Sequence, residues 1–161
     1  MEHHHEESIE EQEIKIWYKR MIWSWVFAIP IAIIMLSERF FNLLIFPEEI
    51  NRIVILILAF IVVFILGFET IKSGTKGLYT FYFNMDSLIA LGTVIAYITG
   101  IFSLFGIMQD YSGVAGMIMA FFITGKYVEA KARGRASQEI KKLLELGAKK
   151  AIILKDNKEI E

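Results

Sequence analysis

The sequence contains no cysteine, only three histidines and only two prolines among its 161 residues. The absence of cysteine excludes disulfides, a Cys-x-x-Cys metal-binding motif and thiolate zinc fingers. The net charge is −1, so the overall charge indicates neither a nucleic acid nor any other charged partner. The chain is instead 55% hydrophobic and carries four long apolar segments. This composition excludes a single soluble core and indicates an integral membrane protein in a lipid bilayer.

The four apolar segments are residues 21–36, 53–68, 87–109 and 112 to about 128. Each is close to the ~20 residues that a helix needs to cross a ~30 Å hydrocarbon core. Pro30 lies in the middle of the first segment and should kink it, which membrane helices tolerate. We therefore predict an all-α membrane fold with four transmembrane helices within residues 15–147.

The fourth segment is followed by a basic stretch that keeps a helical pattern. Ala132, Ala136, Ile140 and Leu143 recur at spacings of four, four and three, which is typical of one face of a helix. Gly147 supplies a stop signal. We expect one continuous helix that leaves the bilayer, extends into the cytosol and connects the membrane part to a soluble part.

Lysine and arginine are distributed unequally between the two sides of the predicted membrane region. All but two of the seventeen basic residues lie before the first helix, between the second and third helices, or after the fourth. The opposite loops hold only Arg39 and Arg52. Because positive charge stays on the inner side, we expect a multi-pass protein of the cell membrane with both termini in the cytosol.

The first fourteen residues are rich in glutamate and contain His3, His4 and His5. So polar a segment has little to bury, and we expect it to be disordered. Three adjacent histidines could bind zinc or copper(II). The interpretation that we favour is a solvated tail or the remainder of a purification tag.

The connection between the second and third segments predicts a bend and a short surface helix. Gly67 can end or bend the second helix near the inner surface. The residues after it have an amphipathic pattern, and Lys72 and Lys76 share one face because they are four residues apart. This face could dock an acidic partner or bind anionic lipid head groups. Spacing alone favours the lipid anchor.

Met85 and Glu129 are expected at the same depth on adjacent antiparallel helices. The midpoint between residues 85 and 129 is residue 107, inside the predicted loop at residues 106–113. A thioether suits a soft ion such as copper(I), and carboxylates at the membrane are functional candidates. The alternatives are packing for Met85 and an ion pair with Arg133 for Glu129. Asp86 or Asn84 can cap the third helix, and we assign Asp86 first to the cap and second to the site.

Two motifs carry a resemblance to a known family. Residues 84–93 read Asn-Met-Asp-Ser-Leu-Ile-Ala-Leu-Gly-Thr, and residues 125–133 read Gly-Lys-Tyr-Val-Glu-Ala-Lys-Ala-Arg. Both resemble consecutive helices of the heavy-metal P-type ATPases, especially the copper(I)-exporting branch. Residues 148–161 resemble the beginning of that family's actuator domain, so we expect its first strands there.

The resemblance implies a role for each candidate site residue. It implies that Met85 and Glu129 form the cytosolic uptake site for copper(I). It also implies that the bend at Gly67, with Lys72 and Lys76, forms a docking platform for a cytosolic copper chaperone. Two departures are a phenylalanine at position 68, where the family often has a second glycine, and a histidine-rich tail in place of a Cys-x-x-Cys domain. The first departure suggests a softer bend.

The resemblance further implies the N-terminal membrane part of an ATP-driven copper(I) exporter. The phosphorylation, nucleotide-binding and Cys-Pro-Cys motifs of the family are absent from the 161 residues. We therefore expect the chain to need the remaining ATPase domains, with ATP and magnesium, for activity. The alternatives are a zinc, divalent or copper(II) branch of the family, or a non-enzymatic membrane protein that binds a partner. A four-helix pore is disfavoured because the membrane segments lack a polar stripe.

Overall fold

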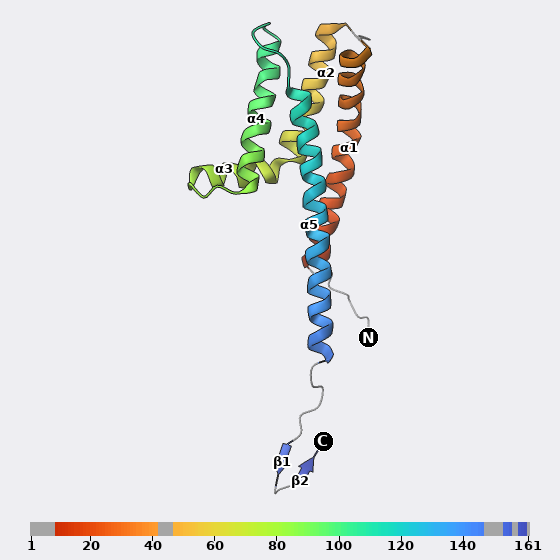
Figure 1. Ribbon diagram of the computed structural model, residues 1–161, viewed down its shortest axis with the longest axis vertical. Coiled ribbons are helices and arrows are strands. Elements are labelled where there is room, and N and C mark those ends of the chain that lie inside the picture. Colours follow the sequence, from red (N-terminus) through yellow and green to blue (C-terminus); the bar gives the residue numbers. More distant parts are fainter. Residues whose placement is uncertain (1–8, 42–46, 147–152, 156–157, 161) are drawn as a thin grey trace.

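The computed structural model describes residues 9–41, 47–146, 153–155 and 158–160. The helices are α1 (Ile9–Phe41), α2 (Glu48–Phe60), the π-helix η1 (Ile61–Leu66), α3 (Phe68–Tyr79), α4 (Met85–Ser103) and α5 (Ser112–Leu146). Two short strands follow, β1 (Ile153–Lys155) and β2 (Lys158–Ile160). Figure 1 shows α1, α2, α4 and α5 as an upright bundle, with α3 projecting sideways from it near the lower end of α4.

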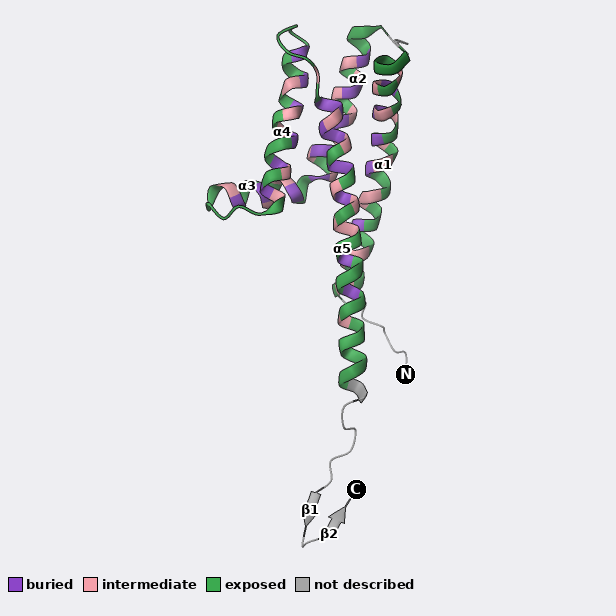
Figure 2. Ribbon diagram, in the orientation of Figure 1, coloured by how far each residue is buried: buried purple, intermediate pink, exposed green. Residues whose placement is uncertain are grey.

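Within the described residues, four helical units are long and apolar enough to cross a membrane. They are Ile9–Phe41, Glu48–Leu66, Met85–Ser103 and Ser112–Leu144. The core between them is apolar and includes Ile31, Val62, Val63, Met119 and Ile123, each fully buried. Buried residues line the inner faces of the helices, whereas many large apolar residues on the outer faces are exposed (Figure 2). An exposed apolar surface of this kind suits contact with lipid, so the four predicted crossings are confirmed in length and composition.

The bend between η1 and α3 lies at the predicted glycine. The Gly67 amide donates to the Val62 carbonyl at 2.9 Å, the five-residue hydrogen bond of a π-helix. A Cβ built at position 67 would lie 2.5 Å from the Val63 carbonyl oxygen and 2.7 Å from Met119 Sδ. Phe68 is 57% exposed and therefore has room. A second glycine is not needed, and α3 still turns sideways from the bundle (Figure 1).

Helix α1 begins earlier than the sequence indicated. Part of the tail that we expected to be disordered, from Ile9 onward, is helical, whereas residues 1–8, with the three histidines, lie outside the described residues. The reason is the packing of α1 against α5. Glu13 pairs with Arg133 at 3.0 Å, and a Cβ at Gly134 would lie 2.8 Å from Ile14 Cδ1, so the first turns of α1 pack closely on α5.

Helix α4 ends at Ser103, six residues before the predicted end at Gln109. The chain then makes a tight turn in which the Ile107 amide donates to the Phe102 carbonyl and Gly106 has a φ of +69°. This turn is itself apolar, so hydrophobicity alone did not mark the helix end. Helix α5 is continuous from Ser112 to Leu146, as predicted, and Gly147, the predicted stop, lies outside the described residues.

Strands β1 and β2 pair antiparallel, with Ile153 opposite Ile160. Their position in the sequence is where we expected the first strands of an actuator domain. That they belong to such a domain stays a prediction.

Candidate metal uptake site

The site begins at the start of α4, which Asn84 caps. The Asn84 side chain accepts a hydrogen bond from the Ser87 amide at 2.8 Å, and the Ser87 hydroxyl completes a capping box. The first assignment of Asp86 to the cap was therefore wrong. Asp86 lies in the first turn, where its carboxylate interacts favourably with the helix dipole and can still pair with a side chain of another helix.

Met85 and Glu129 line the same pocket, between the start of α4 and the middle of α5. The pocket measures ≈ 450 Å³. Its other lining residues are Ile89, Ile118, Phe121, Phe122, Gly125 and Lys126. Met85 is 57% exposed, and the Glu129 side chain is 48% exposed. The structure thus brings together the two residues that the midpoint argument placed at one depth.

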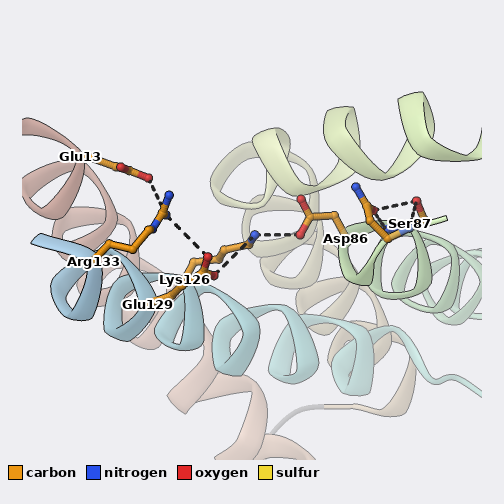
Figure 3. A network of polar contacts seen from close by, with 7 residues as sticks. Glu13, Asp86, Ser87, Lys126, Glu129 and Arg133 are labelled. Atoms are coloured by element: carbon orange, nitrogen blue, oxygen red, sulfur yellow. Dashed lines mark hydrogen bonds and ion pairs between the residues drawn. The ribbon is translucent and has the colours of Figure 1, made fainter. Parts of the chain in front are cut away.

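A chain of ion pairs runs beside this pocket (Figure 3). The Lys126 ammonium lies 3.0 Å from Asp86 Oδ1 and 4.0 Å from Glu129 Oε2. Arg133 lies 3.7 Å from Glu129 Oε1 and 3.0 Å from Glu13 Oε1. The pair of Glu129 with Arg133, which the sequence suggested as an alternative role, is therefore present beside the pocket.

Sequence reasoning did not assign Lys126 to the site. The signal was available, because the midpoint between residues 86 and 126 is residue 106, in the same α4–α5 connection. Lys126 and Asp86 are therefore level on neighbouring helices for the same reason as Met85 and Glu129. Their side chains are only 19% and 14% exposed, whereas those of Glu13, Glu129 and Arg133 are 40%, 48% and 58% exposed.

The candidate metal ligands are few, and one of them, the Met85 thioether, is a soft ligand. Within the described residues, no three His, Cys, Asp or Glu side chains lie close enough to hold a metal ion together. A thioether and one carboxylate at an open, mostly apolar pocket would bind a soft cation weakly, with the carboxylate supplying charge attraction. Such a site can accept an ion and release it, but it lacks the closed ligand shell of a structural metal centre.

Helix α3 is fixed to the start of α4, close to these residues. A Cβ at Gly74 would lie 2.5 Å from both Ala90 Cβ and the Asp86 carbonyl oxygen, so the two backbones approach closely. The Ser87 hydroxyl also donates to the Gly74 carbonyl at 3.1 Å. Lys72 and Lys76 are both exposed on α3, on the far side from this contact surface. The predicted platform residues are thus anchored to the helix that carries Met85.

Comparisons with known proteins find copper-transporting ATPases among the relatives of this chain. The chain is 35% identical over 171 residues to a probable copper-transporting ATPase of Arabidopsis thaliana (HMA5), a match that covers 95% of the chain and 17% of the relative. It is 32% identical over 149 residues to a copper-exporting P-type ATPase of Bacillus subtilis, covering 87% of the chain and 19% of the relative. A copper-exporting P-type ATPase of Staphylococcus epidermidis is 30% identical over 93% of the chain and 20% of its own length.

The chain therefore spans about a fifth of the length of the curated relatives that it matches. No protein-family model matches it, and no solved structure does. The matched region includes nearly all of the helical bundle described above, with its four candidate membrane spans. This chain is therefore a homologue of a membrane-spanning part of the copper-transporting P-type ATPases, and the resemblance that its two motifs indicated is confirmed.

Proposed function

We propose that this chain is the membrane part of an ATP-driven copper(I) exporter and that Met85 and Glu129 form its transient cytosolic uptake site. The observation that carries the proposal is the common pocket of these two side chains, in a chain related to copper-transporting ATPases. The copper-transporting relatives supply the class of ion. The chemistry of the donors supplies the preference for copper(I), because a thioether is a soft ligand.

The two proposed ligands have different roles in ion uptake. The Glu129 carboxylate attracts the cation, and the Met85 sulfur provides the soft ligand at the rim of the pocket. The apolar walls leave the remaining coordination positions unfilled, so the ion is held weakly and passes on. Asp86 is the nearest further carboxylate, and its pairing with Lys126 gives it a secondary role.

The remaining steps of the transport cycle belong to other domains of a complete pump. Phosphoryl transfer needs a phosphorylated aspartate, magnesium and a nucleotide pocket. In this proposal the 161 residues contribute ion uptake and docking and do not themselves hydrolyse ATP. The distribution of lysine and arginine supports a cytosolic location for the uptake site and for both ends of the chain.

Helix α3 is the proposed docking platform for a cytosolic copper chaperone. Its support is geometric. Lys72 and Lys76 are exposed, and α3 packs through Gly74 against the turn of α4 that carries the uptake residues. A chaperone bound on α3 would release its ion close to Met85.

The uptake site is tested with two conservative substitutions in the complete pump. Met85→Leu preserves side-chain volume and Glu129→Gln preserves shape, so both should cost little stability. We expect each to abolish copper-dependent ATP turnover. Met108→Leu and Glu139→Gln are the matched controls, because both side chains are exposed and lie away from the pocket. Wild-type turnover in both site variants would overturn the proposal.

A further inference from the structure

Lys126 places a positive charge, held by an ion pair, at the proposed uptake site. Its side chain lines the same pocket as Met85 and Glu129. The ammonium is held 3.0 Å from Asp86 and lies 5.5 Å from the centre of the Phe122 ring, a cation–π distance. Figure 3 shows it between the two carboxylates, which come from different helices. An ion that binds the Glu129 carboxylate therefore approaches a fixed positive charge, since Lys126 is 4.0 Å from that group.

The charge of the network matches one monovalent cation. Its carboxylates are Glu13, Asp86 and Glu129, and its cations are Lys126 and Arg133. These five side chains together carry a net charge of −1. One monovalent ion neutralises them, whereas a divalent ion leaves an excess of positive charge in a partly buried position.

We propose that Lys126 is a selectivity determinant that favours monovalent over divalent soft cations at this site. The inference rests on the proposed function, because it concerns the same pocket. Two effects act together. Repulsion from the ammonium grows with the charge of the ion, so a divalent ion is penalised twice as much. The ammonium also forms an ion pair with Asp86, so this carboxylate is not free to act as the second carboxylate ligand that a divalent ion needs.

This charge discrimination adds to what the thioether provides. A sulfur ligand separates soft ions from hard ones, but it accepts soft ions of either charge. Selectivity between two soft ions therefore needs a repulsive element against the wrong one. Lys126 is the cationic side chain that lines the pocket within the described residues.

The test is a charge ladder measured on the full 161-residue chain in detergent micelles. Silver(I) and cadmium(II) are the probes, because both are soft d¹⁰ ions that differ chiefly in charge. The three tail histidines are changed to alanine in every variant so that they do not bind cadmium. The ladder consists of Asp86→Asn, the wild type and Lys126→Met, with network charges of 0, −1 and −2. Equilibrium dialysis gives the dissociation constant of each ion, and circular dichroism checks the helical content.

We expect Lys126→Met to tighten silver binding about tenfold and cadmium binding about a hundredfold. The reason is that the repulsion removed with the ammonium is twice as large for a divalent ion as for a monovalent ion. The silver-to-cadmium preference then falls about tenfold, and Asp86→Asn shifts it in the opposite direction by a similar factor. Lys142→Met is the matched control. It removes a lysine of α5 that pairs with a glutamate three residues away, outside the pocket, and should change neither constant.

Two outcomes separate the inference from the function on which it rests. If the silver-to-cadmium preference is the same across the ladder, the selectivity role of Lys126 is wrong, and the uptake site stands. If the Met85→Leu/Glu129→Gln double variant binds both ions as tightly as the wild type, the uptake site itself is wrong. Where Lys126→Met fails to fold, Asp86→Asn alone decides, because an unshifted preference in that variant also overturns the inference.

Discussion

At the scale of single residues, the turn from η1 into α3 depends on the missing Cβ of Gly67. The space that a Cβ would take is filled by a backbone oxygen and by the thioether of Met119, which is fully buried. A backbone atom cannot move aside as a flexible side chain does. The position of α3, and with it the proposed docking platform, therefore depends on this glycine.

Gly67→Ala should destabilise the helical bundle by about 1–3 kcal/mol, because it forces extra volume into a filled site. Gly92→Ala is the matched control, since a Cβ at position 92 meets nothing within 4 Å. The control should change stability by about 1 kcal/mol or less, since alanine suits a helix. Thermal unfolding in detergent, followed by circular dichroism, measures both. Equal melting temperatures for the two variants would contradict the importance of the close contact.

Residue type and spacing predicted part of the site and missed part of it. Met85, Glu129 and Gly67 were identified because their chemistry or conformational freedom is unusual at those positions. The partner of Asp86 was not, because an ion pair between helices depends on how each helix is rotated about its axis. Rotation follows from packing, such as the approach of Gly74 to Ala90, and the sequence does not state which faces meet.

At the scale of elements, α3 joins a polar surface to the proposed uptake residues. One side packs on α4 through its glycines, and the other presents exposed lysines. Helix α3 (Phe68–Tyr79) is the short helix that the sequence predicted after Gly67. The end of α4 and the start of α1 were not predicted. An apolar turn resembles a membrane helix in composition, and the first turns of α1 depend on contacts with residues more than a hundred positions away.

Charge reversal on α3 tests the docking platform. Lys72→Glu/Lys76→Glu should weaken binding of an acidic copper chaperone by at least about tenfold, and added salt should weaken the wild-type complex. Lys131→Glu/Arg135→Glu is the control, because these exposed residues are also four apart but lie on α5. Titration calorimetry of the chaperone against each variant gives the affinities. Equal binding by the two double variants would contradict the docking platform and favour the alternative, a lipid anchor.

At the scale of the whole molecule, the four candidate spans of the described residues and the basic residues together predict an orientation. An even number of crossings puts both ends on one side, and we propose, from the unequal distribution of lysine and arginine, that this side is the cytosol. In this orientation the Met85 pocket and α3 face the cytosol, and the α4–α5 turn faces outward. The candidate spans could be predicted because membrane thickness leaves a plain signal in a sequence, whereas the orientation stays a prediction.

Site-directed labelling tests this orientation. Cysteine replaces Gln109 or Gln138, one at a time, in a chain that has no other cysteine. Both positions are exposed, so access to the reagent is controlled by the membrane. An impermeant maleimide added to intact cells should modify position 109 and leave position 138 unmodified until the cells are opened. Modification of position 138 in intact cells would reverse the topology.

Below the bundle, α1 and α5 form a two-helix beam (Figure 1). Glu13 and Ile14 join Arg133 and Gly134, and Ser137 donates to Glu10 at 3.1 Å. From residue 126 to residue 146, α5 extends about 30 Å at 1.5 Å per residue. A tilt of about 10° at the level of Lys126 would therefore carry Leu146 sideways by about 5 Å. The pocket lies beside the upper end of this part of α5. A movement of the helix near Leu146 is therefore transmitted along α5 to Lys126 and Glu129.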